Sequence, residues 1–165
     1  CADISARTTN ASECVVLSFP SISKNLYFIA YMRVLILCTG NSCRSQMAHG
    51  FLQSFCRDFE VHSAGTKPAE RVNPKAIEVM KEVGIDLSSH RPKSVEIYLN
   101  DEWDYVITVC GGANESCPNF IGKVGKRLHI GFDDPSDATG TDEYVMKEFR
   151  RVRDEIQAKF KKIFL

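Results

Sequence analysis

Apolar and polar positions follow two periods along the chain, one typical of buried strands and one typical of amphipathic helices. Short apolar runs predict four strands, at residues 33–38, 59–62, 105–109 and 127–130. Apolar residues at helical spacing predict helices at residues 45–57, 73–83, 94–99 and 141–160. Because strands alternate with helices, we expect an α/β fold in which a four-stranded parallel sheet lies between two helical layers.

The ends of the second predicted helix carry recognisable signals. Asn73 is a capping residue, and Pro74 suits the first turn. Gly84 follows at the usual C-terminal position. In the last helix, helical spacing predicts a stripe of core residues: Val145, Phe149, Val152, Ile156 and Phe160.

Size and composition narrow the class of protein. A chain of 165 residues suits one domain with a substantial core. Its 21 basic and 21 acidic residues balance, so we expect neither nucleic acid nor a membrane surface as a partner. The seven cysteines are scattered and odd in number. They do not suit a disulfide framework, and they favour redox or nucleophilic chemistry in the reducing cytoplasm.

Residues 1–31 differ in composition from the rest of the chain. They are rich in Ser, Thr, Ala and Asn, and no apolar stretch in them reaches transmembrane length. The pattern of a signal peptide is also missing. Met32 stands directly before the first predicted strand. We therefore expect residues 1–31 to be a poorly ordered extension and residues 32–165 to form the domain.

Residues 38–45 link the first predicted strand to the first predicted helix. A strand, a tight loop and a helix N-terminus together make an anion cradle, in which successive N–H groups converge on one point. Gly40 can take unusual backbone angles there. The predicted oxyanion-binding residues are Thr39, Gly40, Asn41, Ser42, Cys43 and Arg44.

Cys38 supplies this loop with a nucleophile, and Arg44 supplies a planar cation that can bind an oxyanion through two donors. We expect the cradle to lower the pKa of the Cys38 thiol. Cys1 and Arg7 have the same spacing, but no apolar strand precedes them and no glycine lies between them. The context therefore favours the Cys38 loop.

Cys110 and Cys117 bracket a second predicted loop, which contains Gly111 and Gly112. Two thiols at this spacing can form a disulfide if the backbone rearranges. The alternative is that Cys110 is merely a buried residue at the end of a strand. Because Cys110 follows the third strand as Cys38 follows the first, both reach the same edge of a parallel sheet. That shared edge favours a chemical role.

Asp133 and Asp134 follow the fourth predicted strand and reach the same edge. A carboxylate there can protonate a leaving oxygen, although Asp before Pro is also common in solvated turns. The histidines show no spacing typical of metal ligands, and the cysteines lack a paired Cys-x2-Cys pattern. The sequence therefore predicts no metal site and no cofactor.

These motifs resemble those of the thioredoxin-coupled arsenate reductases, which share the fold of the low-molecular-weight tyrosine phosphatases. The resemblance covers residues 32–165. It is carried by residues 38–48, 63–65, 73–76, 80–86, 131–135 and 151–156. The loop at residues 38–48 is common to reductases and phosphatases, whereas the pair of Cys110 and Cys117 is specific to the reductases.

The resemblance implies reduction of arsenate to arsenite, serving arsenic detoxification. Cys38 would attack arsenate held in the loop, Ser45 would steady its thiolate, and Asp134 would protonate the departing oxygen. Cys110 would then attack Cys38 and release arsenite. Cys117 would resolve the Cys38–Cys110 disulfide, and thioredoxin would reduce the Cys110–Cys117 disulfide that results. We expect a monomer.

The sequence departs from the family in two places. Some members bind potassium beside the loop through an Asn, a Glu, a Ser and an Asp. Asn41 and Ser63 match that set, but His49 and Lys93 replace the two carboxylates. This replacement argues against a potassium site and leaves Lys93 to supply positive charge. Residues 118–126 also lack the proline-rich form typical of the family.

Two other functions remain open. A phosphomonoesterase would need only Cys38, Arg44 and Asp134, but the pair of Cys110 and Cys117 would then be superfluous. Pro135 is also not followed by the tyrosines that line the pocket of the phosphatases. A non-enzymatic sensor of oxyanions or redox state would need an output domain, for which the sequence offers no candidate.

Overall fold

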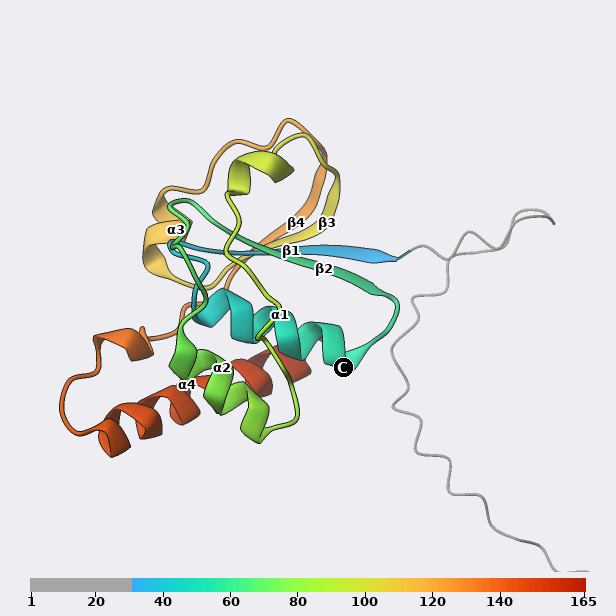
Figure 1. Ribbon diagram of the computed structural model, residues 1–165. Coiled ribbons are helices and arrows are strands. Elements are labelled where there is room, and N and C mark those ends of the chain that lie inside the picture. Colours follow the sequence, from blue (N-terminus) through green and yellow to red (C-terminus); the bar gives the residue numbers. More distant parts are fainter. Residues whose placement is uncertain (1–30) are drawn as a thin grey trace, which may run out of the picture.

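The computed structural model describes residues 31–165 (Figure 1). The expectation for residues 1–31 therefore lies outside the described residues, apart from Tyr31. Four strands form one sheet, in the order β2-β1-β3-β4, and every pairing is parallel. They are β1 (Met32–Cys38), β2 (Phe59–Gly65), β3 (Trp103–Thr108) and β4 (Val124–His129). The predicted parallel sheet is confirmed.

Strand β1 lies in the middle of the sheet and is the most deeply buried. Its residues from Val34 to Leu37 are fully buried, as a continuous apolar run predicts for a strand covered on both faces. Its register with β2 pairs Met32 with Phe59 and Cys38 with Gly65. The C-terminal end of β1 therefore lies directly beside the C-terminal end of β2.

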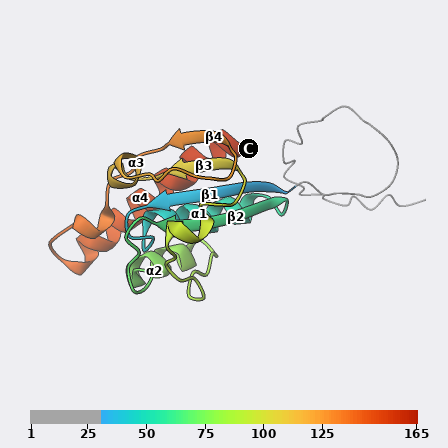
Figure 2. The same ribbon diagram turned by 90° about the horizontal axis from the view of Figure 1, so that it is seen from above.

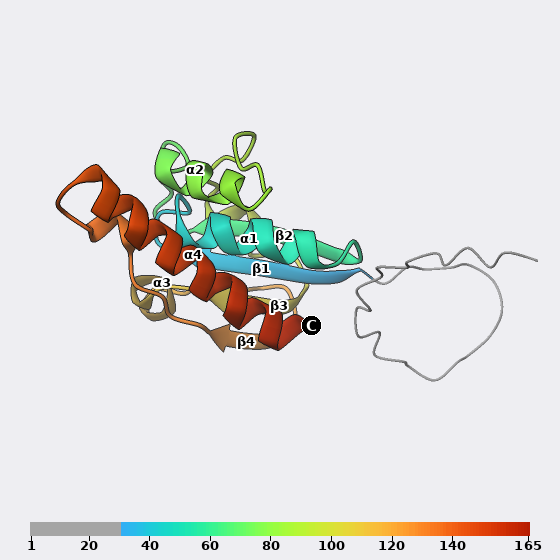
Figure 3. The ribbon, with the colours of Figure 1, turned by 90° about the horizontal axis from the view of Figure 1, so that it is seen from below.

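Three helices, α1 (Arg44–Phe55), α2 (Pro74–Glu82) and α4 (Asp142–Phe164), lie on one side of the sheet (Figures 1 and 3). The opposite layer is thin and contains the short helix η1 (Val95–Tyr98), seen over the sheet in Figure 2. Two further short helices, α3 (Gly111–Glu115) and η2 (Pro135–Asp137), follow β3 and β4 at the carboxyl edge of the sheet.

Helix boundaries follow the predicted signals closely. The Asn73 side chain accepts a hydrogen bond from the Lys75 N–H at 2.9 Å, and Gly84 has a φ of 80°, so both predicted ends of α2 are confirmed. Phe149, Val152, Ile156 and Phe160 are buried and Val145 is partly buried, which confirms the core stripe of α4.

Some boundaries differ from the prediction. Helix α4 continues to Phe164, because the ring of Phe164 packs edge-on against Phe59 and Tyr105. Strand β2 continues to Gly65, because Ser63 and Ala64 are buried and pair with β1.

The segment between Cys110 and Cys117 is a short helix, α3, where the sequence predicted a loop. Two glycines in a row argue against a helix, but its ends are capped. The Cys110 sulfur accepts a hydrogen bond from the Ala113 N–H at 3.4 Å, and the Ser116 side chain donates to the Gly112 carbonyl. These local bonds outweigh the low helix propensity of glycine.

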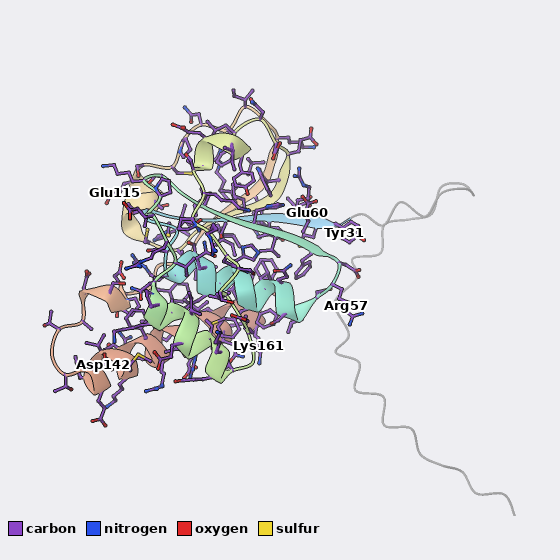
Figure 4. All side chains as sticks on the ribbon, viewed as in Figure 1. Tyr31, Arg57, Glu60, Glu115, Asp142 and Lys161 are labelled. Carbon is purple, nitrogen blue, oxygen red and sulfur yellow. The ribbon has the colours of Figure 1, made fainter. Side chains whose placement is uncertain are left out.

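The surface is polar around most of the molecule. Glu115 and Asp142 lie at the outline of the molecule in Figure 4, and both are exposed, as is Lys161. Within residues 31–165, none of the helices combines the length and the apolar composition that a membrane span requires.

Candidate active site

The loop between β1 and α1 is held from outside through its carbonyl oxygens. Segment 67–73, which follows β2, donates backbone hydrogen bonds to it. These bonds join Lys67 N–H to Thr39 O (2.9 Å), Ala69 N–H to Gly40 O (2.9 Å) and Asn73 N–H to Ser42 O (2.8 Å). The carbonyl of Asn41 accepts from the Gln46 side chain at 3.0 Å. The carbonyls of residues 39–42 therefore all point away from the loop interior.

The direction of the carbonyls fixes the direction of the N–H groups. None of the peptide bonds in this loop is cis, so the N–H of each following residue points opposite to the carbonyl before it. The N–H groups of residues 40–43 therefore face inward. The Asn41 N–H does so, because it donates to the Cys38 sulfur at 2.9 Å. The loop is an anion cradle built around Cys38.

Two residues allow the tight path of this loop. Asn41 has a positive φ of 48°, a conformation that Asn tolerates better than most residues. At Gly65, a Cβ atom would lie 2.5 Å from the Thr39 carbonyl oxygen. Only glycine lets β2 approach the loop so closely. This role of Gly65 is not visible in the sequence alone.

The Cys38 sulfur is buried and lies 2.9 Å from the Ser45 hydroxyl. The direction of that hydrogen bond follows from its neighbours. The Asn41 amide oxygen accepts from the Lys93 N–H at 2.9 Å, and the Asn41 amide nitrogen donates to Ser45 at 2.9 Å. Ser45 therefore accepts from Asn41 and has its own proton to donate to Cys38. That proton stabilises a thiolate.

The expected lowering of the Cys38 pKa is wrong for this structure. Burial of the sulfur raises its pKa above the ordinary value and outweighs the hydrogen bonds from Ser45 and Asn41, which act in the other direction. The Arg44 guanidinium is paired with Asp134 and bonded to the Phe132 carbonyl at 3.0 Å.

Arg44 and Asp134 meet beside the cradle, at the carboxyl edge of the sheet. Arg44 is the first residue of α1, and Asp134 caps η2 by accepting from the Ser136 N–H at 3.0 Å. Both side chains are partly buried, at 14 and 29 % exposure. The ion pair joins the two side chains for which the sequence predicts oxyanion binding and proton transfer.

Cys110 lies close to the cradle, as the strand order predicts. Its sulfur is buried and lies 3.5 Å from the hydroxyl of Thr39, the residue that follows Cys38 in the chain. Gly112 approaches the same hydroxyl, since a Cβ there would lie 2.9 Å from the Thr39 oxygen. Cys43 is also buried, and burial raises the pKa of its thiol.

Cys117 is not brought to the cradle. It lies at the far end of α3, half-buried, and its sulfur accepts a hydrogen bond from Arg127 at 3.5 Å. Its sulfur therefore has a different environment from those of Cys38 and Cys110. Sequence patterns could not indicate a role for Arg127, because the contact joins a loop to an edge strand.

The residues at the expected potassium position do not fit that ion. Potassium is held by oxygen ligands, yet the Asn41 oxygen accepts from Lys93, and the Ser63 hydroxyl lies 3.1 Å from an imidazole nitrogen of His49. Burial, with the neighbouring positive charges, lowers the pKa of His49 to about 3. Among residues 31–165, no group of three or more His, Cys, Asp or Glu side chains is placed to hold a metal ion.

The sequence from residue 33 to residue 164 matches the family described as low molecular weight phosphotyrosine protein phosphatase. The chain belongs to this family. An arsenate reductase of Shouchella clausii (strain KSM-K16) is 49% identical over 130 residues, which are 78% of this chain and 92% of that protein. The predicted resemblance to arsenate reductases of this fold is therefore confirmed.

Solved structures agree with this assignment. One described as an arsenate reductase in the phosphate binding state has a TM-score of 0.67 at 30% identity, covering 79% of this chain and 95% of that one. A low molecular weight protein tyrosine phosphatase from T. tengcongensis has a TM-score of 0.66 at 30% identity. The match covers 80% of this chain and 97% of that one. Because both superpose equally well, the fold alone does not separate reductase from phosphatase.

Proposed function

We propose that this member of the family reduces arsenate to arsenite through three thiols, at Cys38, Cys110 and Cys117. The observation that carries the proposal is the position of Cys110. A hydrolase needs one thiol in the cradle, whereas here a second buried thiol lies against the cradle residue Thr39. The curated relative at 49% identity is an arsenate reductase, which supports the same activity.

In the first step, arsenate lies on the inward N–H groups of the loop, and Arg44 leaves Asp134 to bind its oxygens. Cys38 attacks arsenic, and an arsenic–sulfur bond forms while an arsenic–oxygen bond breaks. Asp134 is well placed to donate a proton to the oxygen that departs as water. Ser45 steadies the Cys38 sulfur through its hydroxyl proton.

In the second step, Cys110 attacks the Cys38 sulfur. The new sulfur–sulfur bond replaces the sulfur–arsenic bond, whose electron pair stays on arsenic and reduces it to arsenite. Cys117 then attacks Cys110, which returns Cys38 to its thiol form and leaves a Cys110–Cys117 disulfide. Helix α3 must open for this step, because it holds the two sulfurs at its opposite ends.

We further propose that thioredoxin reduces the Cys110–Cys117 disulfide and that the protein acts as a monomer in the cytoplasm. Cys117 supports the choice of a protein reductant, since it is partly exposed whereas Cys38 and Cys110 are buried. Each disulfide formed in sequence is therefore more accessible to a partner than the one before it.

A phosphomonoesterase remains the second candidate. Cys38, Arg44 and Asp134 suffice for it, and the superposition on a tyrosine phosphatase favours it as much as the one on a reductase. Phosphate and arsenate have nearly the same shape and charge, so weak phosphate-ester hydrolysis is expected of either enzyme.

The experiment that separates them measures NADPH oxidation with thioredoxin, thioredoxin reductase and arsenate. The parent chain is compared with Cys110→Ser and Cys117→Ser, and hydrolysis of p-nitrophenyl phosphate is measured in parallel. A reductase requires arsenate-dependent turnover that both variants lose. No arsenate-dependent oxidation, together with hydrolysis that both variants retain, would make the protein a phosphatase.

A further inference from the structure

An open pocket of about 370 Å³, called the cavity below, is lined by residues of β3, α3 and β4 and by Cys117. Val106 and Leu128 contribute apolar wall, while Thr108, Asn114 and His129 contribute polar groups. The Thr108 hydroxyl lies 2.9 Å from a ring nitrogen of His129. Its volume falls within the range of small-molecule sites. Of the residues that line it, the proposed arsenate reduction uses only Cys117.

Cys117 and Arg127 also line this cavity. The Arg127 guanidinium donates to the Cys117 sulfur at 3.5 Å and lies over the Phe120 ring, 5.2 Å from its centroid. The ring contact holds the guanidinium in place, and Arg127 remains exposed. A partly exposed sulfur and a positioned cation therefore share one opening.

The other free thiols among the described residues are much less accessible. Cys38, Cys43 and Cys110 are each 3–4% exposed, whereas Cys117 is half-buried. A bulky group attached to any of these three buried sulfurs would have to displace the loop or α3. At Cys117 it can extend into the cavity.

We propose that Cys117 and this cavity form a site for a mixed disulfide with a low-molecular-weight thiol that bears a carboxylate. The sulfur of the ligand bonds to Cys117, and its carboxylate binds Arg127. Its polar groups meet Asn114 and His129 inside the cavity. A tripeptide thiol such as glutathione has this combination of one sulfur, carboxylates and peptide groups.

The modification is a thiol–disulfide exchange with the oxidised form of the small thiol. The Cys117 sulfur attacks one sulfur of that disulfide, so the old sulfur–sulfur bond breaks and the new bond to Cys117 forms. The proton of Cys117 leaves with the released thiol, which is reduced as Cys117 is oxidised. Under the proposed function, on which this consequence rests, the modified Cys117 cannot resolve the Cys38–Cys110 disulfide, and turnover stops there.

The test uses the reduced full-length chain without arsenate, so its result does not depend on the proposed function. The Cys110→Ser background prevents Cys110 from removing the attached group. Oxidised glutathione and the neutral bis(2-hydroxyethyl) disulfide are compared as reagents, and mass spectrometry of the peptide that contains Cys117 gives the rate of modification. The variants are Arg127→Gln and, as a control with the same charge change, Lys126→Gln.

Lys126 is an apt control because it is exposed on the same strand, next to Arg127, and its ammonium lies over the Tyr105 ring rather than in the cavity. We expect Arg127→Gln to slow modification by oxidised glutathione about fivefold, because an exposed ion pair contributes up to about 1 kcal/mol. The rate with the neutral reagent should change little. Lys126→Gln should change neither rate. Equal effects of the two substitutions, or glutathione attachment at Cys38 or Cys43 ahead of Cys117, would overturn the proposal.

Discussion

The cradle around Cys38 and the segment from Cys110 to Cys117 carry related thiol chemistry in opposite kinds of structure. Every carbonyl of residues 39–42 is engaged by a hydrogen bond from outside the loop, and Cys38 is buried. Helix α3, by contrast, has five residues, begins with two glycines and is mostly exposed.

The difference follows from what each region has to do. An oxyanion is recognised only if several N–H groups are already aimed at one point, since ordering them during the reaction would raise the barrier. Passing a disulfide from Cys38 to Cys117 requires the opposite property, a segment that can open at small cost. Substitutions in each region can test whether the cradle is rigid and whether α3 opens easily.

The largest effect is expected at Gly65, which supports the cradle. In Gly65→Ala, the added methyl would lie 2.5 Å from the Thr39 carbonyl, and that backbone cannot move without breaking its bond to Lys67. We expect a loss of about 2–3 kcal/mol in the free energy of unfolding, measured by urea titration. Arsenate turnover should fall with it. Unchanged stability would show that the cradle is not rigid.

Much of this contrast could be predicted from the sequence. The apolar run before Cys38 and the spacing to Arg44 predicted the cradle, because strand, loop and helix N-terminus are local features. The close approach of Gly65 could not be predicted, since it depends on the register between β1 and β2. Nor could the burial that raises the pKa of Cys38, which depends on packing of the whole carboxyl edge.

Helix α3 was missed for a related reason. The glycines in its sequence predicted a loop, and the helix forms through a cap from the Cys110 sulfur and a bond from the Ser116 side chain. The contact between Arg127 and Cys117 joins residues ten positions apart on different elements. Such contacts appear only when the chain is folded.

Ser45→Ala is expected to reduce turnover about tenfold. It removes the proton donated to the Cys38 sulfur and leaves the Asn41 amide without its acceptor. Because that hydrogen bond lowers the Cys38 pKa, its loss should move the pH profile of Cys38 alkylation to higher pH. Ser54→Ala is the control, since Ser54 lies on the same helix and bonds only to the Phe51 carbonyl. Equal pH profiles of Cys38 alkylation in the two variants would show that Ser45 does not donate to the Cys38 sulfur.

His49, whose ring lies 3.1 Å from the Ser63 hydroxyl, should make the stability of the protein depend on pH. Its folded pKa is about 3, below the value near 6.5 of an unfolded chain, so the unfolded state binds a proton first. The free energy of unfolding should therefore fall as the pH drops from about 6.5 towards 3, by about 1–2 kcal/mol at pH 5. His49→Gln should weaken this dependence. Stability curves of equal slope for parent and variant would be the contrary result.

The smallest effect is expected at Gly111, where a Cβ would meet nothing within 4 Å. Gly111→Ala should stabilise α3 by about 0.5 kcal/mol, because alanine loses less backbone entropy in a helix. That stabilisation should slow formation of the Cys110–Cys117 disulfide about twofold, followed by rapid quenching and mass spectrometry. Faster formation of this disulfide in Gly111→Ala than in the parent chain would mean that α3 does not need to open.

The most direct test of the three-thiol account is a single turnover of reduced Cys117→Ser with arsenate and no thioredoxin. Arsenite and disulfide-linked peptides are both quantified. The account predicts one equivalent of arsenite per chain and a persistent disulfide between Cys38 and Cys110. Arsenite released without that disulfide, or no arsenite from a folded protein that still hydrolyses phosphate esters, would contradict it.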